Sequence, residues 1–135
     1  MKRALCILAL VPALAAAGCG SSDKDKVKSV VQSYIDGLAT HNGKKVCDQL
    51  AGSVQSLVKE RASAKSCAAA INTFQSSAIG RSVAPAFKTA KIKDVTVKGG
   101  TAAATLNVAV AGKNNPVTIP LEKVSGNWKI TSPAQ

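Results

Sequence analysis

Residues 94–110, DVTVKGGTAAATLNVAV, contain the pattern that decides the fold. Apolar side chains alternate with polar or small ones on both sides of the pair Gly99-Gly100. A period of two is typical of strands that bury one face, and glycines between two such runs indicate a tight turn. The stretch therefore predicts an antiparallel hairpin whose inward residues are Val95, Val97, Leu106, Val108 and Val110.

The alternation continues toward the C-terminus. Turn-forming residues at 112–116 and 125–127 separate two further runs, in which Val117, Ile119, Leu121, Trp128 and Ile130 are expected to face inward. Because parallel neighbours need a long crossover, the short turns predict a four-stranded antiparallel meander. Pro120 lies inside the third run and has no N–H to donate, so we expect that strand to be an edge or to contain a bulge.

Before Pro85 the apolar residues recur at helical spacing. The run from 27 to 38 predicts a first helix, with Asp23 or Asp25 available near its N-terminus and Asn42-Gly43 as its stop signal. A second stripe, from 46 to 58, is expected to break near Gly52-Ser53 into two short helices, and a third, from 67 to 78, to end before Gly80. Helices followed by strands predict an α+β fold, with the N-terminal helices packed on one face of a curved, cone-like four-stranded antiparallel sheet.

Residues 1–18 predict a cleaved lipoprotein signal peptide. Lys2 and Arg3 precede an apolar stretch that, at about 14 residues, is shorter than the roughly 20 needed to span a bilayer. The sequence from Ala16 to Cys19 resembles the bacterial lipobox, with an alanine where a leucine is usual. That resemblance implies a diacylglyceryl group, with chains such as palmitate, on the Cys19 thiol and cleavage before it. The alternative is an ordinary secretory peptidase acting at residues 15–17, which would release a soluble protein.

The chain is therefore expected to have three parts. These are the lipoprotein signal peptide at 1–18, a lipidated polar tether at 19–26 and a single α+β domain at 27–132. Two acyl chains anchor a protein stably, whereas one binds a membrane only marginally. We expect the protein on the extracytoplasmic face of the cell membrane, held there by its lipid anchor.

The four cysteines are expected to have three different roles. Cys6 leaves with the signal peptide and Cys19 takes the lipid, so Cys47 and Cys67 remain as a pair. Two thiols left in an exported protein are expected to form a disulfide. Closing a loop of about 20 residues stabilises a domain by roughly 3 kcal/mol in the chain-entropy model. A redox role is not expected, because the pair lacks Cys-x-x-Cys spacing.

The mature part is strongly basic. Beyond residue 18 it has sixteen Lys and Arg residues against seven Asp and Glu residues, a net charge of +9, with clusters at 44–45, 59–65 and 88–98. Outside the cytoplasm the available anions are lipid headgroups and cell-wall polymers, which makes either one a candidate partner. Nucleic acid is not expected, because export separates the protein from it and the chain has few aromatic residues for stacking. The alternative is a solvated basic surface without a dedicated ligand.

Three features together resemble small exported lipoproteins of the nuclear-transport-factor-2-like superfamily. They are the helix VVQSYIDGL at 30–38, the cysteines at 47 and 67, and the terminal strand GNWKI at 126–130. The resemblance implies a cone-shaped α+β fold whose helices close over a curved sheet. The cavity inside such a cone is used for catalysis, for binding a small ligand or for docking a partner.

The resemblance also shows what an enzyme of this fold would need. Ketosteroid-isomerase-like and polyketide-cyclase-like members place a carboxylate and a Tyr or acid inside the cone. The expected inward strand positions contain no ionisable side chain. Tyr34 and Trp128 are the candidates for lining a cavity, and Asp36 falls on a different helical face from Tyr34. His41 is the only histidine and both remaining cysteines are expected to be bonded, so we predict no catalytic residue, no metal site and no cofactor.

These observations predict a cell-surface lipoprotein that is a non-enzymatic binding or accessory domain. Its ligand would be a small apolar molecule in the cone or an anionic envelope component on the basic surface. The alternative is a structural module that docks a partner, oligomeric or not, and an isomerase- or dehydratase-like enzyme of the same fold is the weaker third possibility.

Overall fold

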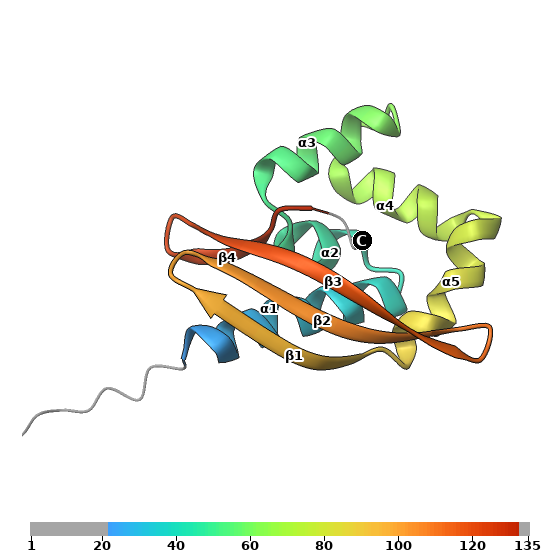
Figure 1. Cartoon of the computed structure of the whole chain (residues 1–135). Helices are drawn as coiled ribbons and strands as arrows, with labels where there is room; N and C mark the ends of the chain where they lie inside the picture. Colours follow the sequence, from blue (N-terminus) through green and yellow to red (C-terminus); the bar gives the residue numbers. More distant parts are fainter. Residues whose placement is uncertain (1–21, 133–135) are drawn as a thin grey trace, which may run out of the picture.

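The computed structural model describes residues 22–132, which form five helices followed by four strands (Figure 1). The helices are α1 (Asp23–Ala39), α2 (Gly43–Gln49), α3 (Gly52–Arg61), α4 (Cys67–Ser76) and α5 (Ala78–Lys88). The strands are β1 (Lys91–Lys98), β2 (Thr101–Val110), β3 (Lys113–Val124) and β4 (Asn127–Ile130). The predicted α+β fold is confirmed. The expected signal peptide and Cys19 lie outside the described residues.

The strands form one antiparallel sheet in the order β1-β2-β3-β4, as predicted. Its register places Val95 opposite Ala104, and Ala104 opposite Ile119, on the face that the helices cover. Figure 1 shows α1 running along that face while α3, α4 and α5 continue around one side. None of the helices in residues 22–132 is both long and apolar enough to cross a membrane.

Pro120 lies in β3, an inner strand rather than the expected edge, and does not disturb it. Its carbonyl oxygen accepts a hydrogen bond from Thr131 N at 3.1 Å, so its ring nitrogen also points away from β2. Strand β4 pairs only with residues 121–124 of β3, which leaves residues 113–119 without a strand partner on that side. The pairing of β2 and β3 is regular, so the predicted bulge at Pro120 is absent, and the sheet's irregularity is in β1, between Ile92 and Asp94.

Helix α1 begins at Asp23, one of the two aspartates expected near its N-terminus, although the predicted tether extended to residue 26. Residues 23–26, which fall in the predicted tether, form its first turn. Ser22 Oγ accepts a hydrogen bond from Asp25 N at 3.2 Å and donates one to Asp25 Oδ2 at 2.6 Å, which is a reciprocal cap. The expected tether therefore shortens to residues 19–22.

The predicted break in the second helical stripe is confirmed. Helices α2 and α3 are separated at Leu50 and Ala51, and Ala51 N donates to Ile130 O at 2.8 Å, which ties the break to the last strand. The expected stop signal Asn42-Gly43 also starts α2, because Asn42 Oδ1 accepts from Lys45 N at 2.9 Å. A Cβ on Gly43 would lie 2.5 Å from Ala68 O, so only glycine allows α2 to approach α4 this closely.

Helix α5 was not predicted, because Pro85 lies inside it and its buried face consists of small residues. Gly80, expected as a terminator, lies in its first turn and packs against α4, where an added Cβ would overlap Phe74 O. The core is centred between α1 and the sheet, and its most fully buried large side chains are Val27, Val31, Val46, Leu106, Ile119, Leu121 and Ile130. Val110 was expected inward but is 48% exposed at the end of β2.

Two cross-links hold the helices together. The expected disulfide between Cys47 and Cys67 is confirmed and joins α2 to α4, with a Cα–Cα distance of 6.1 Å. Gln75, in α4, is 3% exposed and donates through Nε2 to the backbone oxygens of Gly37 at 3.2 Å and Leu38 at 3.1 Å. These carbonyls lie in the last turn of α1. Gly37 O also accepts from Asn42 N at 2.9 Å, whereas the Leu38 oxygen is an acceptor that the helix terminus leaves unpaired and the Gln75 amide satisfies.

Candidate functional site

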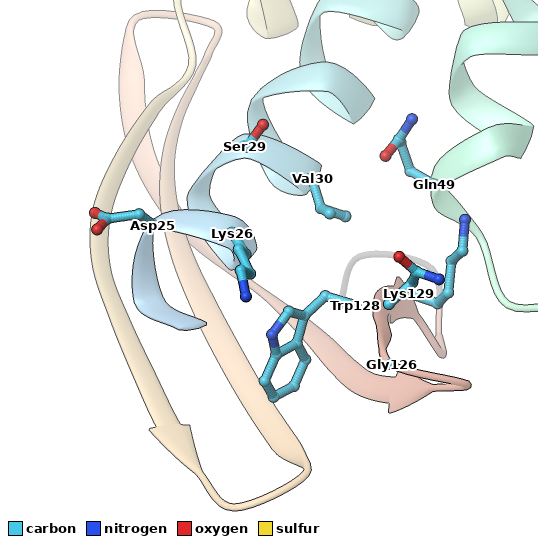
Figure 2. Close-up of a pocket in the computed structure, with 9 residues that line it drawn as sticks. Asp25, Lys26, Ser29, Val30, Gln49, Gly126, Trp128 and Lys129 are labelled. Carbon is cyan, nitrogen blue, oxygen red and sulfur yellow. The ribbon is translucent and has the colours of Figure 1, made fainter. Parts of the chain in front are cut away.

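The first candidate site is a cleft of 560 Å³ between α1 and the β3–β4 hairpin, here called the helix–hairpin cleft (Figure 2). This volume lies within the range of small-molecule sites, roughly 300–1,000 Å³. Six of its nine lining residues are polar or charged, and they include charges of both signs. The lining residues are Asp25, Lys26, Ser29, Val30, Gln49, Gly126, Asn127, Trp128 and Lys129.

A charged cluster beside this cleft fixes its shape. The Asp23 carboxylate accepts two hydrogen bonds from Lys123 Nζ, at 3.0 and 3.1 Å, and one from Trp128 Nε1 at 3.3 Å. Lys123 Nζ also lies 5.6 Å from the centre of the Trp128 ring, within cation–π range. The start of α1 is thereby bound to a hairpin that lies 100 residues further along the chain.

The same contacts lower the pKa of Asp23. The hydrogen bond from Lys123 is the largest cause, followed by the one from the Trp128 indole. A carboxyl whose pKa is lower in the folded state stabilises the fold above its ordinary pKa, and loses that contribution as the pH falls through the folded value. Because the Asp23 side chain is 35% exposed, solvent screens this contribution.

Trp128 is a wall of the helix–hairpin cleft but is not an open stacking surface. Its side chain is 3% exposed and its indole N–H already donates to Asp23. Figure 2 shows Lys26 just above the indole, with Gln49 and Lys129 across the cleft. Lys129 Nζ donates to Asp48 O at 2.5 Å. The cleft can therefore offer charge and hydrogen bonds to a ligand, whereas the Trp128 ring packs into the hydrophobic core.

Tyr34, the other candidate cavity residue, lies in the core. It is 9% exposed, and burial raises the pKa of its hydroxyl. It lines neither the helix–hairpin cleft nor three further depressions of the described surface. Asp36 accepts instead from Gln32, at 2.9 Å, and lies 3.5 Å from Lys45 Nζ. Within residues 22–132, then, the hydroxyl of Tyr34 has no carboxylate as hydrogen-bond partner.

His41 lies just beyond α1 with φ 55° and is exposed. Neither a hydrogen bond nor an ion pair involves its side chain in the described part of the chain. Cys47 and Cys67 are bonded to each other, so neither thiol is available as a nucleophile. No three His, Cys, Asp or Glu side chains of residues 22–132 gather closely enough to bind a metal ion.

The second candidate site, here called the lysine cleft, has a volume of 580 Å³. Its lining comes from the end of α5 and from three strands: Lys88, Thr89, Lys91, Asn107, Ala109 and Asn114. None of these residues is acidic. The sequence indicated the basic cluster at 88–98, but its asparagine neighbours were missed, because they come from other strands. The strand register was the signal that could have found them, since it places Lys91 opposite Asn107 and Ala109 opposite Asn114.

Two comparisons with known proteins agree on the fold. A family model described as "Putative lumazine-binding" matches residues 22–134, which include every described residue. The crystal structure of a "Putative NTF2-like transpeptidase" from Campylobacter jejuni matches with a TM-score of 0.54 and 13% identity, covering 78% of this chain and 97% of that one. No curated protein matches the chain. The second likeness concerns the fold alone, and it confirms the expected nuclear-transport-factor-2-like architecture.

Proposed function

This chain belongs to the family described as "Putative lumazine-binding", and we propose that it is a binding module of the cell surface that catalyses no reaction. In this proposal a lipid on Cys19 anchors it to the extracytoplasmic face of the membrane. Its ligand is an anionic component of the cell envelope, bound on the basic surface. The observation that carries the proposal is the excess of lysines without a carboxylate partner.

Most of the positive charge is unpaired. Of the sixteen Lys and Arg side chains in residues 22–132, five lie within 4.0 Å of a carboxylate, and the other eleven do not. The five are Lys24, Lys26, Lys44, Lys45 and Lys123. Cations without a carboxylate partner attract anions, and salt screens this attraction. This supports an anionic ligand more strongly than a neutral one.

The close packing of the interior is a second reason to expect the ligand on the surface. The inward residues of the sheet pack into the hydrophobic core with the helices, and Leu106, Ile119 and Ile130 are at most 1% exposed. A small apolar molecule inside the cone would have to displace these contacts. The basic surface is open without any such rearrangement.

The cysteines and the histidine of the described residues favour a binding function over an acyl-transfer reaction. The solved structure with the similar fold is named a transpeptidase, and acyl transfer requires an activated nucleophile next to a base. In residues 22–132 both cysteines are in a disulfide, and His41 has no hydrogen-bond partner. None of these three side chains is arranged for that chemistry.

The anchor is tested by replacing its cysteine. In the wild-type protein, intact mass and N-terminal sequencing are expected to show a chain that begins at residue 19 and has a diacylglyceryl mass on Cys19. Cys19→Ala is expected to lose both the cleavage and the added mass. Cys6→Ala is the matched control, because Cys6 is removed with the signal peptide, and its mature product should be identical to wild type. A free thiol at Cys19 in a chain that begins at residue 18 would contradict lipidation and indicate ordinary secretion.

The anionic ligand is tested by salt dependence. Purified protein in neutral detergent is expected to bind fluorescently labelled polyphosphate, and binding should weaken steadily as the ionic strength rises, because exposed charges are screened within about 10 Å at 0.1 M salt. Labelled dextran, a neutral polymer, is the control and should not bind. Fluorescence anisotropy measures both. If the protein binds no polyanion, or binds it independently of salt, the proposed ligand class is wrong.

A further inference from the structure

We propose that the lysine cleft is the binding site for phosphate groups of an envelope polymer, on the side of the domain that faces away from the membrane. The inference rests on the anion-binding function proposed above. It specifies where on the domain the anion binds, which chemical group is bound, and which way the binding site faces relative to the membrane.

Four polar side chains of the cleft are free to bind. Lys88 ends α5 and Lys91 begins β1, so only Thr89 and Ala90 separate the two lysines along the chain. Asn107 lies opposite Lys91, and Asn114 follows on the next strand. Within residues 22–132, the side chains of these two lysines and two asparagines form no hydrogen bond or ion pair.

Three lysines at the opposite end of the molecule are paired with carboxylates instead. There Lys24, Lys26 and Lys123 are all engaged by Asp23 or Asp94. The lining of the lysine cleft contains no carboxylate to neutralise its two ammonium groups. Its positive charge is therefore available to a ligand, whereas these three lysines near the start of α1 are engaged within the fold.

The donor set fits phosphate. Lysine binds phosphate as a compact point charge, and the amide nitrogen of an asparagine can donate to a further phosphate oxygen. The cleft is lined by lysine ammonium groups and asparagine amides and by no arginine. Its 580 Å³ exceed the volume of one phosphate group, so the neighbouring unit of a polymer can enter with it.

The cleft also lies far from the expected anchor. Asp23, at the start of α1, contacts Lys123, whose backbone N–H donates to Gly100 O in the β1–β2 turn at 2.8 Å. The cleft is lined by residues from the other end of the strands, among them the first residue of β1. Figure 1 shows the start of β1 and the β2–β3 turn at the end of the sheet opposite the start of α1. The ten residues of β2 span about 30 Å, and a tether of residues 19–22 extends to at most about 14 Å. A lipid on Cys19 therefore favours an outward-facing cleft, away from the headgroups of its own bilayer.

The test compares two pairs of lysines with equal charge. Wild-type protein, K88A/K91A and K59A/K65A are each reconstituted in phosphatidylcholine vesicles and titrated with labelled polyphosphate. K88A/K91A is expected to weaken binding about tenfold or more, because it removes two charge-assisted contacts. K59A/K65A removes the same charge at α3 and the loop after it, and should weaken binding less than about threefold, the effect of bulk charge alone. Unchanged thermal unfolding confirms that both variants fold.

Each other outcome overturns a different part of the inference. Equal weakening by the two pairs would show that polyanions bind the whole basic surface, which removes the cleft but keeps the proposed function. Equal affinity for polyglutamate and polyphosphate would remove the preference for phosphate. If replacing part of the phosphatidylcholine by phosphatidylglycerol abolishes the difference between wild type and K88A/K91A, the cleft faces its own membrane. Absence of any polyanion binding by wild type would instead reject the proposed function itself.

Discussion

Gln75→Glu is expected to lower the free energy of unfolding by about 3–4 kcal/mol at pH 7. Gln75 is 3% exposed, and its amide nitrogen donates to the carbonyl oxygens of Gly37 and Leu38 at the end of α1. A carboxylate there would face two carbonyl oxygens and the negative end of the helix dipole. The folded protein would take up a proton instead, which at pH 7 costs roughly 3.7 kcal/mol for a glutamate with an ordinary pKa near 4.3.

This variant has a defined pH dependence. Burial beside carbonyl oxygens raises the pKa of the introduced carboxyl in the folded state above its unfolded value. Its contribution to stability is therefore complete below about pH 4 and is lost as the pH rises through the folded pKa. Urea unfolding at pH 4, 5.5 and 7 measures this loss. The fluorescence of Trp128, the only tryptophan, reports the unfolding.

Gln75→Met is the matched control. It has a similar length but no charge, and leaves the Leu38 oxygen without its side-chain donor, so a loss of about 1–2 kcal/mol is expected. Because Gln75 Oε1 has no partner in the described structure, removing that atom offsets part of this loss. The difference between the methionine variant and wild type should not change between pH 4 and 7. A glutamate variant that is no less stable than the methionine variant at pH 7 would show that position 75 is not held in a dry, acceptor-rich site.

The sheet could be predicted from sequence because each strand buries one face, which leaves a period of two. Val95, Leu106 and Ile119 are inward as expected, and each is at most 2% exposed. Val110 shares their pattern but lies at the β2–β3 turn, opposite Lys113, where nothing in residues 22–132 buries it. Periodicity predicts which face a residue occupies, but whether another element covers that face depends on where the helices end.

Helix α5 could not be predicted for a related reason. Helical periodicity is recognised from large apolar residues, whereas the buried face of α5 consists of Gly80, Ala84 and Ala86. Close packing requires small residues here, as the contact between Gly80 and the backbone of Phe74 shows. Pro85 adds a signal that ordinarily ends a helix. Only the packing of α5 against α4 identifies these residues as part of the fold.

The candidate sites depend on contacts between residues far apart in sequence. Asp23 falls in the predicted tether, yet it binds the Trp128 indole, 105 positions later. The lysines at 88 and 91 form a basic cluster in the sequence, but their cleft needs Asn107 and Asn114 from the neighbouring strands. The predicted meander did not contain the register that brings these four together, because residues 112–116 were expected to form a turn, whereas Asn114 lies in β3 opposite Ala109. The Asp23 contact depends on how α1 lies across the sheet, which no local pattern specifies.

Removal of the disulfide is expected to cost about 3 kcal/mol of unfolding free energy, which is a large share of the roughly 5–15 kcal/mol typical of a domain. The Cys47–Cys67 bond spans a sequence separation of 20 residues that contains α3 and the loop before α4. Cys47→Ala/Cys67→Ala removes both sulfurs, so no buried thiol remains to complicate the result. Without the bond, α3 keeps few anchors, because Val54 is its only buried residue and Leu57 is 40% exposed.

Urea unfolding of the oxidised wild type, the reduced wild type and the double alanine variant tests this prediction. The midpoint should fall by a similar amount on reduction and in the variant, and the reductant should leave the variant unchanged. Hydrogen exchange adds a local readout: protection should be lost first in residues 52–66, while β2 and β3 keep theirs, since the most fully buried side chains of the core lie outside the loop that the bond closes. A midpoint that is the same with and without the bond would mean that the contacts of α2 with α4, including Gly43 N to Asn72 Oδ1 at 2.9 Å, already hold this corner in place.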